Sequence, residues 1–299
     1  MELHRRSDPG NPITPIEPSA AFDARGVDCD GRQASHATAL GRFDVAVASS
    51  RGAHRIDNED AHSELGGRGH LFVVADGVGG GAMAAYASRR LVRELHAALD
   101  GRRLDPARLN AAMLDADRAI ARSIAECTDL PGAATVVLAA PVDAFGARWL
   151  IGWVGDCRAY RVPTTMDAGP EPLTRDDTFR ALAETPPAGG SPDDPARMVG
   201  NGAIAGANVA RVELAADELL VLCTDGVHKH LERQAWRQAV RQPGSLARRC
   251  EALVAAARGA GSADDATVLA LQRSSWFSMR RPRWAARGER GDRLGGVRG

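Results

Sequence analysis

The order of its apolar segments is the feature that most limits how this chain can fold. Short apolar runs typical of strands come first, two helical patterns follow, strands in hairpin-like succession fill the middle, and two further helical patterns precede a last strand. A doubly wound parallel sheet requires regular alternation of strands and helices, which this order lacks. The sequence therefore predicts an α+β sandwich of antiparallel sheets with helices packed outside.

Periodicity places the individual elements. Residues 43–49 alternate in the period of a half-buried strand, whereas the continuous apolar run 71–75 predicts a strand covered on both faces. Apolar residues spaced by four predict a helix over 81–99, and a second stripe predicts a helix over 106–126, capped by Asp105 with Pro106 in its first turn. The remaining predictions are strands at 135–140, 149–154, 159–162, 210–214, 219–223 and 267–271, and helices at 231–240 and 245–257.

Composition divides the chain into two tails and one domain. Residues 1–41 are rich in Pro, Gly, Asp and Ala without periodicity, which predicts a disordered N-terminal tail. The domain covers 42–273 and contains a Pro- and Gly-rich stretch, 163–209, of the kind that forms functional loops or flaps. Residues 274–299 form an arginine-rich C-terminal tail. We expect this tail to be disordered and solvated rather than bound to anionic lipid.

The global composition sets limits on location and partners. The formal net charge is zero and the domain has no basic stripe, so a nucleic-acid partner is not expected. No apolar run approaches the roughly 20 residues of a membrane span, the start is polar, and the five cysteines show no CxxC pairing. These features favour a cytoplasmic monomer. The chain has a single lysine, Lys229, and its sequence context indicates no function for it.

Three acidic motifs adjoin apolar runs: Asp76–Gly77, Asp225–Gly226 and Asp264–Asp265. A carboxylate beside a buried strand is costly to desolvate unless a cation pairs with it. Three acidic motifs in this position indicate that a bound metal ion is the cation. Hard divalent cations prefer oxygen ligands, and an Asp followed by Gly offers a carboxylate together with an unobstructed carbonyl.

Other motifs have simpler alternatives. The segment 55–60 crowds three acids and an arginine into a loop, which by itself fits a solvated turn. The glycines after Asp76 suggest a phosphate loop, but they match neither GxGxxG nor GK[ST], and the acid would repel a phosphate. Asp156 fits an ordinary hairpin turn, and Cys157, with no neighbouring histidine, fits inert packing better than a nucleophile.

Taken in order, these segments resemble a known family. They are RxDNED (55–60), VVADGVGG (73–80), AAT (133–135), VGDCRAY (154–160), TRDDTF (174–179), LCTDG (222–226) and SADDATVL (262–269). The chain resembles the protein phosphatase 2C-like, metal-dependent Ser/Thr phosphatase (PPM) family, in particular its bacterial branch, over about residues 43–272. The resemblance implies a central β-sandwich flanked by helix pairs, in four layers αββα, with a dinuclear Mg²⁺ or Mn²⁺ centre at one end.

The resemblance also implies metal ligands. Asp76 would bridge both metals, and the carbonyl of Gly77 would ligate the second. Asp225 and Asp264 would ligate the first metal.

Other residues would support these ligands or contact the substrate. Glu59 and Asp60 would hold metal-bound waters, and Arg55 would bind the substrate phosphate. Asp156 would help to hold a third, weaker metal. Asp265 stands where the family usually has asparagine, and it would support the ligands without being one of them.

The activity implied is hydrolysis of phosphoserine and phosphothreonine by a water activated between two metals, reversing a bacterial Ser/Thr kinase. The segment 177–206 corresponds to the family's variable flap, and within it 194–199 is similar to phosphatases associated with type VI secretion. Gly81 stands where many bacterial members have a histidine that can act as general acid. Two alternatives stay open: a phosphoprotein-binding pseudophosphatase, and another carboxylate-metal hydrolase such as a nuclease.

Overall fold

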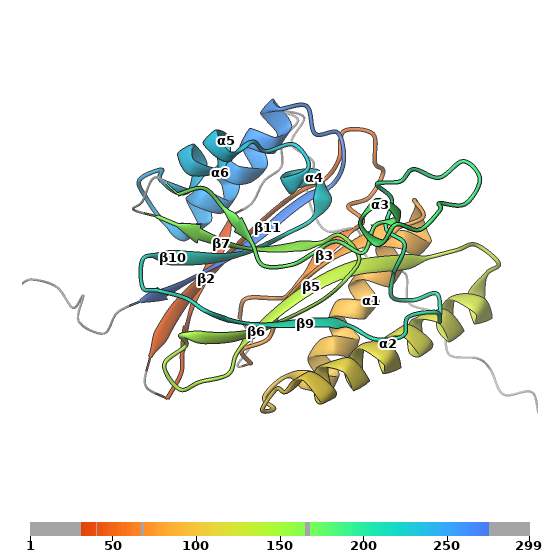
Figure 1. Ribbon diagram of the computed structural model, residues 1–299, viewed down its shortest axis with the longest axis horizontal. Helices are drawn as coiled ribbons and strands as arrows, with labels where there is room; N and C mark the ends of the chain where they lie inside the picture. The colour runs from red at the N-terminus through yellow and green to blue at the C-terminus, as the bar shows by residue number, and fades with distance from the viewer. Residues whose placement is uncertain (1–30, 40, 67–68, 165–167, 275–299) are drawn as a thin grey trace, which may run out of the picture.

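Two antiparallel sheets pack face to face, and helices cover the outer face of each (Figure 1). The computed structural model describes residues 31–39, 41–66, 69–164 and 168–274. The six-stranded sheet has the order β1-β2-β11-β10-β7-β8, and the five-stranded sheet has the order β3-β4-β5-β6-β9. The helices α5 and α6 lie on the first sheet, and α1 and α2 lie on the second. The predicted four-layer α+β sandwich is confirmed.

The strands and helices follow the predicted order, with five short additions. The six-stranded sheet contains β1 (Arg32–Ala37), β2 (Arg42–Ser50), β7 (Arg158–Pro163), β8 (Glu171–Pro172), β10 (Glu218–Cys223) and β11 (Ala266–Ser274). The five-stranded sheet contains β3 (Asp60–His62), β4 (Phe72–Val78), β5 (Ala133–Pro141), β6 (Arg148–Val154) and β9 (Asn208–Glu213). The helices are α1 (Ala82–Leu99), α2 (Pro106–Cys127), α3 (Phe179–Leu182), α4 (Asp225–His228), α5 (Arg233–Val240) and α6 (Leu246–Gly259).

Three apolar layers hold the sandwich together. One lies between the sheets and includes Phe43, Phe72 and Trp149, and the other two join each sheet to its own helices. Strand β2 was predicted to be half-buried, but it is buried on both faces. Its valines enter the layer between the sheets, while Ala46 and Ala48 pack under the helices. The small alanine side chains allow α6 to approach this face closely, which explains why simple alternation was misleading.

The segment predicted to be a disordered N-terminal tail contains strand β1. This edge strand pairs antiparallel with β2, from Arg32 opposite Val47 to Ala37 opposite Arg42. Most of its side chains are exposed or half-buried, but His36 is buried and stacks on Phe43 with ring centroids 5.5 Å apart. An edge strand with one buried side chain has little hydrophobic signal, so the sequence pattern missed it. Residues 1–30 and 275–299 lie outside the described residues.

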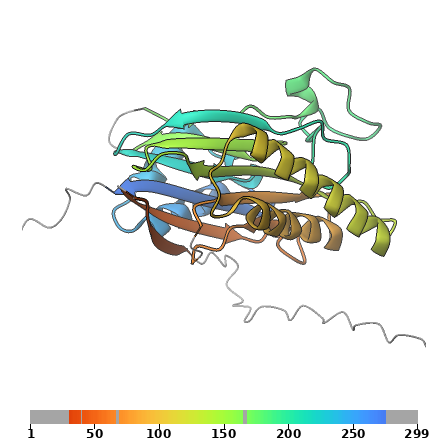
Figure 2. The same ribbon diagram turned by 90° about the horizontal axis from the view of Figure 1, so that it is seen from below.

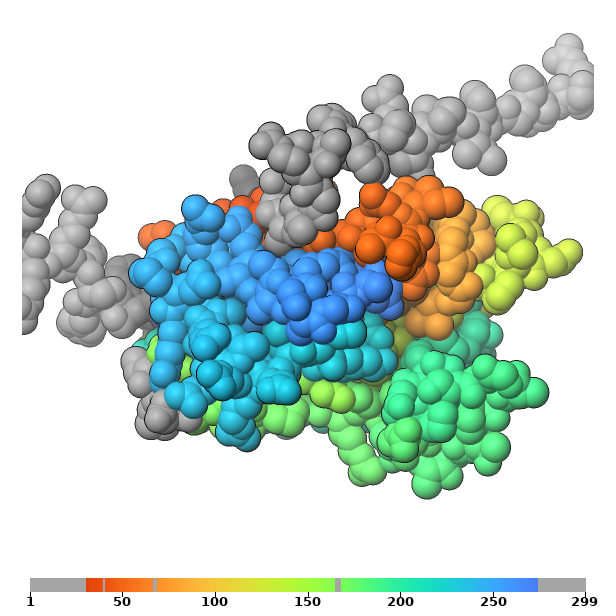
Figure 3. Space-filling model, turned by 90° about the horizontal axis from the view of Figure 1, so that it is seen from above, coloured from red at the N-terminus to blue at the C-terminus, as the bar shows by residue number. Residues whose placement is uncertain are grey.

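The predicted flap, 177–206, projects from one end of the sandwich (Figures 2 and 3). It contains the short helix α3, and two isolated bridges pair Thr178 with Pro195 and Ala134 with Val199. The first bridge therefore closes the flap on itself, and the second joins the flap to β5. Within the described ranges, no helix is long and apolar enough to cross a membrane.

Candidate active site

Two acids predicted from the sequence face each other on neighbouring strands. Asp60 of β3 is paired with Asp76 of β4, and Asp76 is paired on its other side with Thr135 of β5. Strand β4 continues to Val78, so Asp76 lies inside the strand and not at its end as predicted. Directly opposite side chains in an antiparallel pair lie only about 5 Å apart at Cβ. The ladder therefore brings the carboxylates of buried Asp60 and half-buried Asp76 together.

The other two acids come from the facing sheet. Asp225 begins α4 directly after β10, and Asp264 lies two residues before β11, the neighbour of β10. Thr224 joins the two halves, because its hydroxyl donates to Asp60 Oδ2 at 2.9 Å and accepts from the Thr267 amide at 3.0 Å. The acids of both sheets thus meet at one end of the sandwich.

Burial and mutual repulsion dominate the electrostatics of this cluster. Burial, then the charges of Asp60, Asp225 and Asp156, raise the pKa of Asp76 well above its ordinary value. Burial also raises the pKa of Asp60 strongly, although hydrogen bonds from threonine hydroxyls oppose the shift. The pKa of Asp156 rises to about 6, chiefly through burial and the charge of Asp225. The raised pKa values mean that the positive charge near these carboxylates does not balance their burial and mutual repulsion. A bound cation would supply the missing charge.

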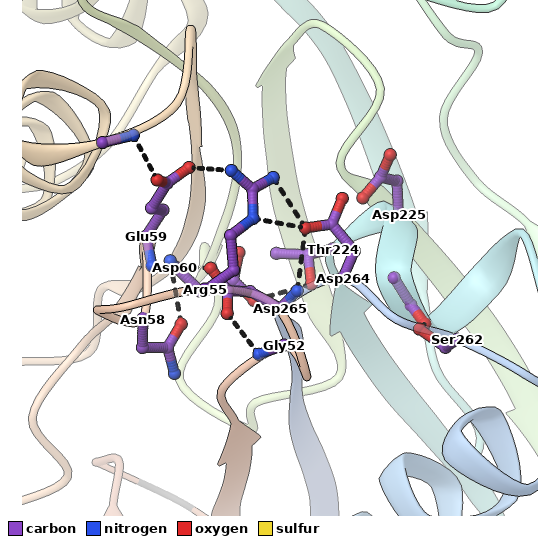
Figure 4. Close-up of polar contacts among 12 residues, drawn as sticks. Gly52, Arg55, Asn58, Glu59, Asp60, Thr224, Asp225, Ser262, Asp264 and Asp265 are labelled. Atoms are coloured by element: carbon purple, nitrogen blue, oxygen red, sulfur yellow. Dashed lines mark hydrogen bonds and ion pairs between the residues drawn. The ribbon is translucent and has the colours of Figure 1, made fainter.

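Arg55 lies at the exposed rim of the cluster (Figure 4). Its Nη1 is 2.8 Å from Glu59 Oε2, and its Nη2 is 2.8 Å from Asp264 Oδ1. About a third of its side chain is exposed, so the guanidinium is accessible from solvent. Arg55 is held in place by the acids that were predicted to act beside it.

A second cation, Lys229, was not predicted. Its ammonium lies 2.9 Å from Asp156 Oδ2 and 2.7 Å from Asp225 Oδ2. Burial opposes the charge of Lys229, but the two carboxylates outweigh it and raise its pKa. Burial raises the pKa of Asp225, but the charge and hydrogen bond of the same lysine outweigh burial and leave this pKa below its ordinary value. The only sequence signal was the presence of a single lysine four residues after Asp225.

The comparisons with known proteins agree with this arrangement. The sequence profile described as protein phosphatase 2C matches residues 49–252, more than half of the chain. The chain belongs to the protein phosphatase 2C family. A search of curated protein sequences returned no significant match.

Solved structures of bacterial phosphatases share the fold. The serine/threonine phosphatase PstP/Ppp of Mycobacterium tuberculosis is 26% identical, with a TM-score of 0.65 over 77% of this chain and 98% of its own. The catalytic domain of PstP in complex with two manganese ions is 25% identical, with a TM-score of 0.65 over 78% of this chain and 99% of its own. PppA, described as a key regulatory component of the type VI secretion system in Pseudomonas aeruginosa, is 23% identical, with a TM-score of 0.64 over 81% of this chain and 100% of its own.

The donor set of this phosphatase-family chain suits hard divalent cations. Asp60 Oδ1 and Asp225 Oδ1 are buried and have no hydrogen-bond partner among the described residues. Unpartnered carboxylate oxygens in a buried site are the ligands that Mg²⁺ and Mn²⁺ prefer. In the described part of the chain, however, no group of three or more His, Cys, Asp or Glu side chains is already arranged around a common point. Arg55 contacts Asp264 Oδ1 and Lys229 contacts Asp225 Oδ2, so a side-chain cation occupies one oxygen of each of these two acids.

Asp265 positions the loops around the site. Its Oδ1 accepts from the Gly52 amide at 2.6 Å, and its Oδ2 accepts from the Glu59 amide at 2.7 Å. Two amide donors suit a carboxylate better than an asparagine, whose NH₂ group would face one of the donors. This explains the departure from the usual asparagine. It agrees with the supporting role implied by the resemblance.

Arg258 of α6 is a further residue that the sequence did not reveal. Its guanidinium donates to the carbonyls of Asp264 and Ser262, and at 2.8 Å to the carbonyl of Ser50. It therefore holds the backbone of the loop that carries Asp264. Nothing in the local sequence distinguishes this arginine from the others on α6, because its partners are distant along the chain or belong to the backbone.

Two glycines and one cysteine of the predicted motifs have clear structural roles. A Cβ at Gly77 would lie 2.5 Å from the carbonyl oxygen of Ala84, so the close approach of α1 requires glycine there. Gly81 has φ of +82° and its amide donates to Glu59 Oε1. Cys157 is buried beside Thr135, and burial raises the pKa of its thiol well above the ordinary value, which fits packing and not nucleophilic attack.

Proposed function

We propose that this chain is a metal-dependent protein serine/threonine phosphatase that hydrolyses phosphoserine and phosphothreonine at a dinuclear centre. One observation carries the proposal. Asp60 and Asp76 are opposed on one sheet, Asp225 and Asp264 approach from the other, and an accessible arginine lies at the rim. Family membership and a manganese-containing relative support the same conclusion.

In this proposal the acids have different roles in binding two Mg²⁺ or Mn²⁺ ions. Asp76, whose pKa is raised first by burial and then by acids of both sheets, would bridge the ions, and the Gly77 carbonyl would ligate the second. Asp225 and Asp264 would ligate the first ion, while Glu59 and Asp60 would hold waters bound to the ions. Two such ions lower the pKa of a shared water and neutralise negative charge on phosphoryl oxygens.

Arg55 binds the phosphate group of the substrate in this proposal. A guanidinium fork matches two phosphate oxygens, and Arg55 is held at the rim by Glu59 and Asp264. Part of each ion pair must loosen when the guanidinium turns to a phosphate. The two acids therefore orient Arg55 before binding and compete with the substrate for it.

The substrates we propose are phosphorylated Ser/Thr proteins, including those of a cognate kinase. The flap, 177–206, supports selection of protein substrates, since Asp177 at its start is hydrogen-bonded to Gly155 of the Asp156 turn. Ion pairs Arg180–Asp193 and Arg197–Glu184 brace it. A type VI secretion partner is a finer proposal based on residues 194–199. Deleting 184–196 should affect phosphoproteins more than small aryl phosphates, and equal loss on both would contradict a recognition role.

The central test measures phosphate release from an aryl phosphate and from a phosphothreonine peptide, with and without Mn²⁺. We expect activity on both only with the metal, and its loss in Asp76→Asn. Asp115→Asn, on the exposed face of α2, is the matched control because it removes one carboxylate far from the site. Activity on DNA alone, or no activity from folded protein with bound metal, would overturn the proposal.

A further inference from the structure

Lys229 joins two acids of the site across a turn of chain. It directly follows α4, so its backbone amide donates to the carbonyl of Asp225 at 3.0 Å and its side chain returns to the Asp225 carboxylate. The same ammonium reaches Asp156, which lies in the turn between β6 and β7. The two ammonium contacts are short enough to be charge-assisted hydrogen bonds.

Asp156 needs a positive charge nearby. Only 3% of its side chain is exposed, and Asp225 is close enough to oppose its ionisation. The neighbouring arginine, Arg158, binds another acid, because it forms a bidentate ion pair with Asp176 at 2.7 and 2.6 Å. Lys229 is therefore the side chain that compensates the charge of Asp156.

We propose that the Lys229 ammonium is a built-in cation that takes the place of a further divalent ion between Asp156 and Asp225, so that this chain binds two metal ions and not three. The inference rests on the proposed dinuclear site and refines it. It also revises the expectation that Asp156 helps to hold a third, weaker metal. Asp156 becomes the counter-ion of Lys229.

The ammonium and a divalent ion cannot use the same oxygens together. Mg²⁺ binds carboxylate oxygens at about 2.0–2.1 Å and requires nearly octahedral geometry. Lys229 Nζ already lies between Asp156 Oδ2 and Asp225 Oδ2. An ion placed there would contact the ammonium directly and be repelled by it. Because Lys229 is part of the covalent chain, its effective concentration at this position is high at every metal concentration.

The rest of the metal site is left intact by this arrangement. Lys229 uses one oxygen of Asp225, while Asp225 Oδ1 is buried and has no hydrogen-bond partner among the described residues. Asp60 Oδ1 is likewise buried and without a hydrogen-bond partner among these residues. Asp225 can therefore serve the dinuclear centre with one oxygen and Lys229 with the other.

The test is a direct count of bound Mn²⁺ by equilibrium dialysis and elemental analysis at millimolar metal, which needs no enzymatic activity. We expect two ions per chain for the wild type and three for Lys229→Met, a variant of similar length without the charge. Lys229→Arg should retain two. Lys229→Met combined with Asp156→Asn should also return to two, since the added site would lose its ligand.

The control Arg118→Met removes an exposed positive charge on α2 and should leave two ions bound. Three ions in the wild type, or two in a folded Lys229→Met protein as judged by circular dichroism, would overturn the inference. If Lys229→Met gains an ion but neither protein hydrolyses a phosphate ester, the proposed function fails and the inference stands. If the wild type hydrolyses phosphate esters with three ions bound, the inference fails and the proposed function stands. A wild type that binds no Mn²⁺ overturns both.

Discussion

Asp60 lies directly opposite Asp76 in the antiparallel ladder of β3 and β4. Like charges at such a position destabilise a sheet, and here Asp60 is buried and Asp76 is half-buried. The two carboxylates therefore repel each other in the folded protein, and protons or bound cations relieve this repulsion. The following predictions test this pair and the residues around it.

The stability of metal-free protein should depend on this repulsion. A carboxyl whose pKa is raised in the folded state stabilises the fold below its unfolded pKa and loses that contribution as pH rises through the folded pKa. For Asp156, with a pKa of about 6, the loss is about 3 kcal/mol. The pKa of Asp76 is raised in the same direction. We expect Asp76→Asn to become increasingly more stable than the wild type between about pH 4 and 7 in the presence of a chelator.

Urea denaturation at several pH values measures this difference. Asp115→Asn should show no such trend, because its carboxylate is exposed. With Mn²⁺ present the order should reverse, since the wild type gains free energy from binding the ion. A constant difference between Asp76→Asn and the wild type across this range would contradict the prediction.

Arg55 should contribute mainly to substrate binding. Arg55→Lys keeps the charge but loses the fork, so we expect kcat/KM for an aryl phosphate to fall by roughly tenfold or more, chiefly through KM. Steady-state kinetics at saturating Mn²⁺ provide the measurement. Arg118→Lys, on an exposed helix face, is the control. An unchanged KM with a lower kcat would assign Arg55 a role other than binding the phosphate.

Asp117 should anchor one end of the flap. This buried side chain of α2 accepts hydrogen bonds from the amides of Gly200 at 2.6 Å and Gly202 at 3.0 Å. Asp117→Ala should cost about 1–3 kcal/mol and speed hydrogen exchange of those amides, because both lose their acceptor. Asp117→Asn retains a side-chain oxygen and should have a smaller effect. Equal exchange rates in the alanine variant and the wild type would exclude the anchor.

Gly81 should limit activity on alkyl phosphates. No histidine occupies its position, so we expect slower turnover of phosphoserine than of an aryl phosphate with a better leaving group. Gly81→His should improve the phosphoserine-to-aryl ratio and alter the pH–rate profile. Its φ of +82° strains any side chain, so Gly81→Ala is required as the control, with an expected cost of about 1–3 kcal/mol. An identical ratio in all three proteins would refute a proton-donor role at this position.

The sequence was most informative where a pattern depends on local spacing. The runs before Asp76 and Asp225 and the run after Asp264 identified their strands, and the helices near 82–99 and 106–127 were predicted within a residue. Asp105 caps its helix as expected, by accepting from the Arg108 amide. Such features depend on neighbours in the chain, so they leave a signal in the sequence.

Features that depend on distant partners were missed. Strand β1 is stabilised by β2, the short helix α4 is formed where β10 meets the site, and Arg258 serves a loop whose contacts close only in the folded chain. Lys229 is the clearest case: its importance follows from Asp156, 73 residues away. The roles of the individual metal ligands likewise stay predictions until metal binding is measured.

The division of the acids between two sheets has a mechanical consequence. The two sheets are separate hydrogen-bonded ladders that meet through an apolar layer containing Trp149. An ion shared by Asp76 and Asp225 would act as a cross-link between two halves of the molecule. The affinity of the site for this ion would then depend on the relative position of the two sheets. A substitution deep in the apolar layer between them would therefore weaken metal binding at the end of the sandwich.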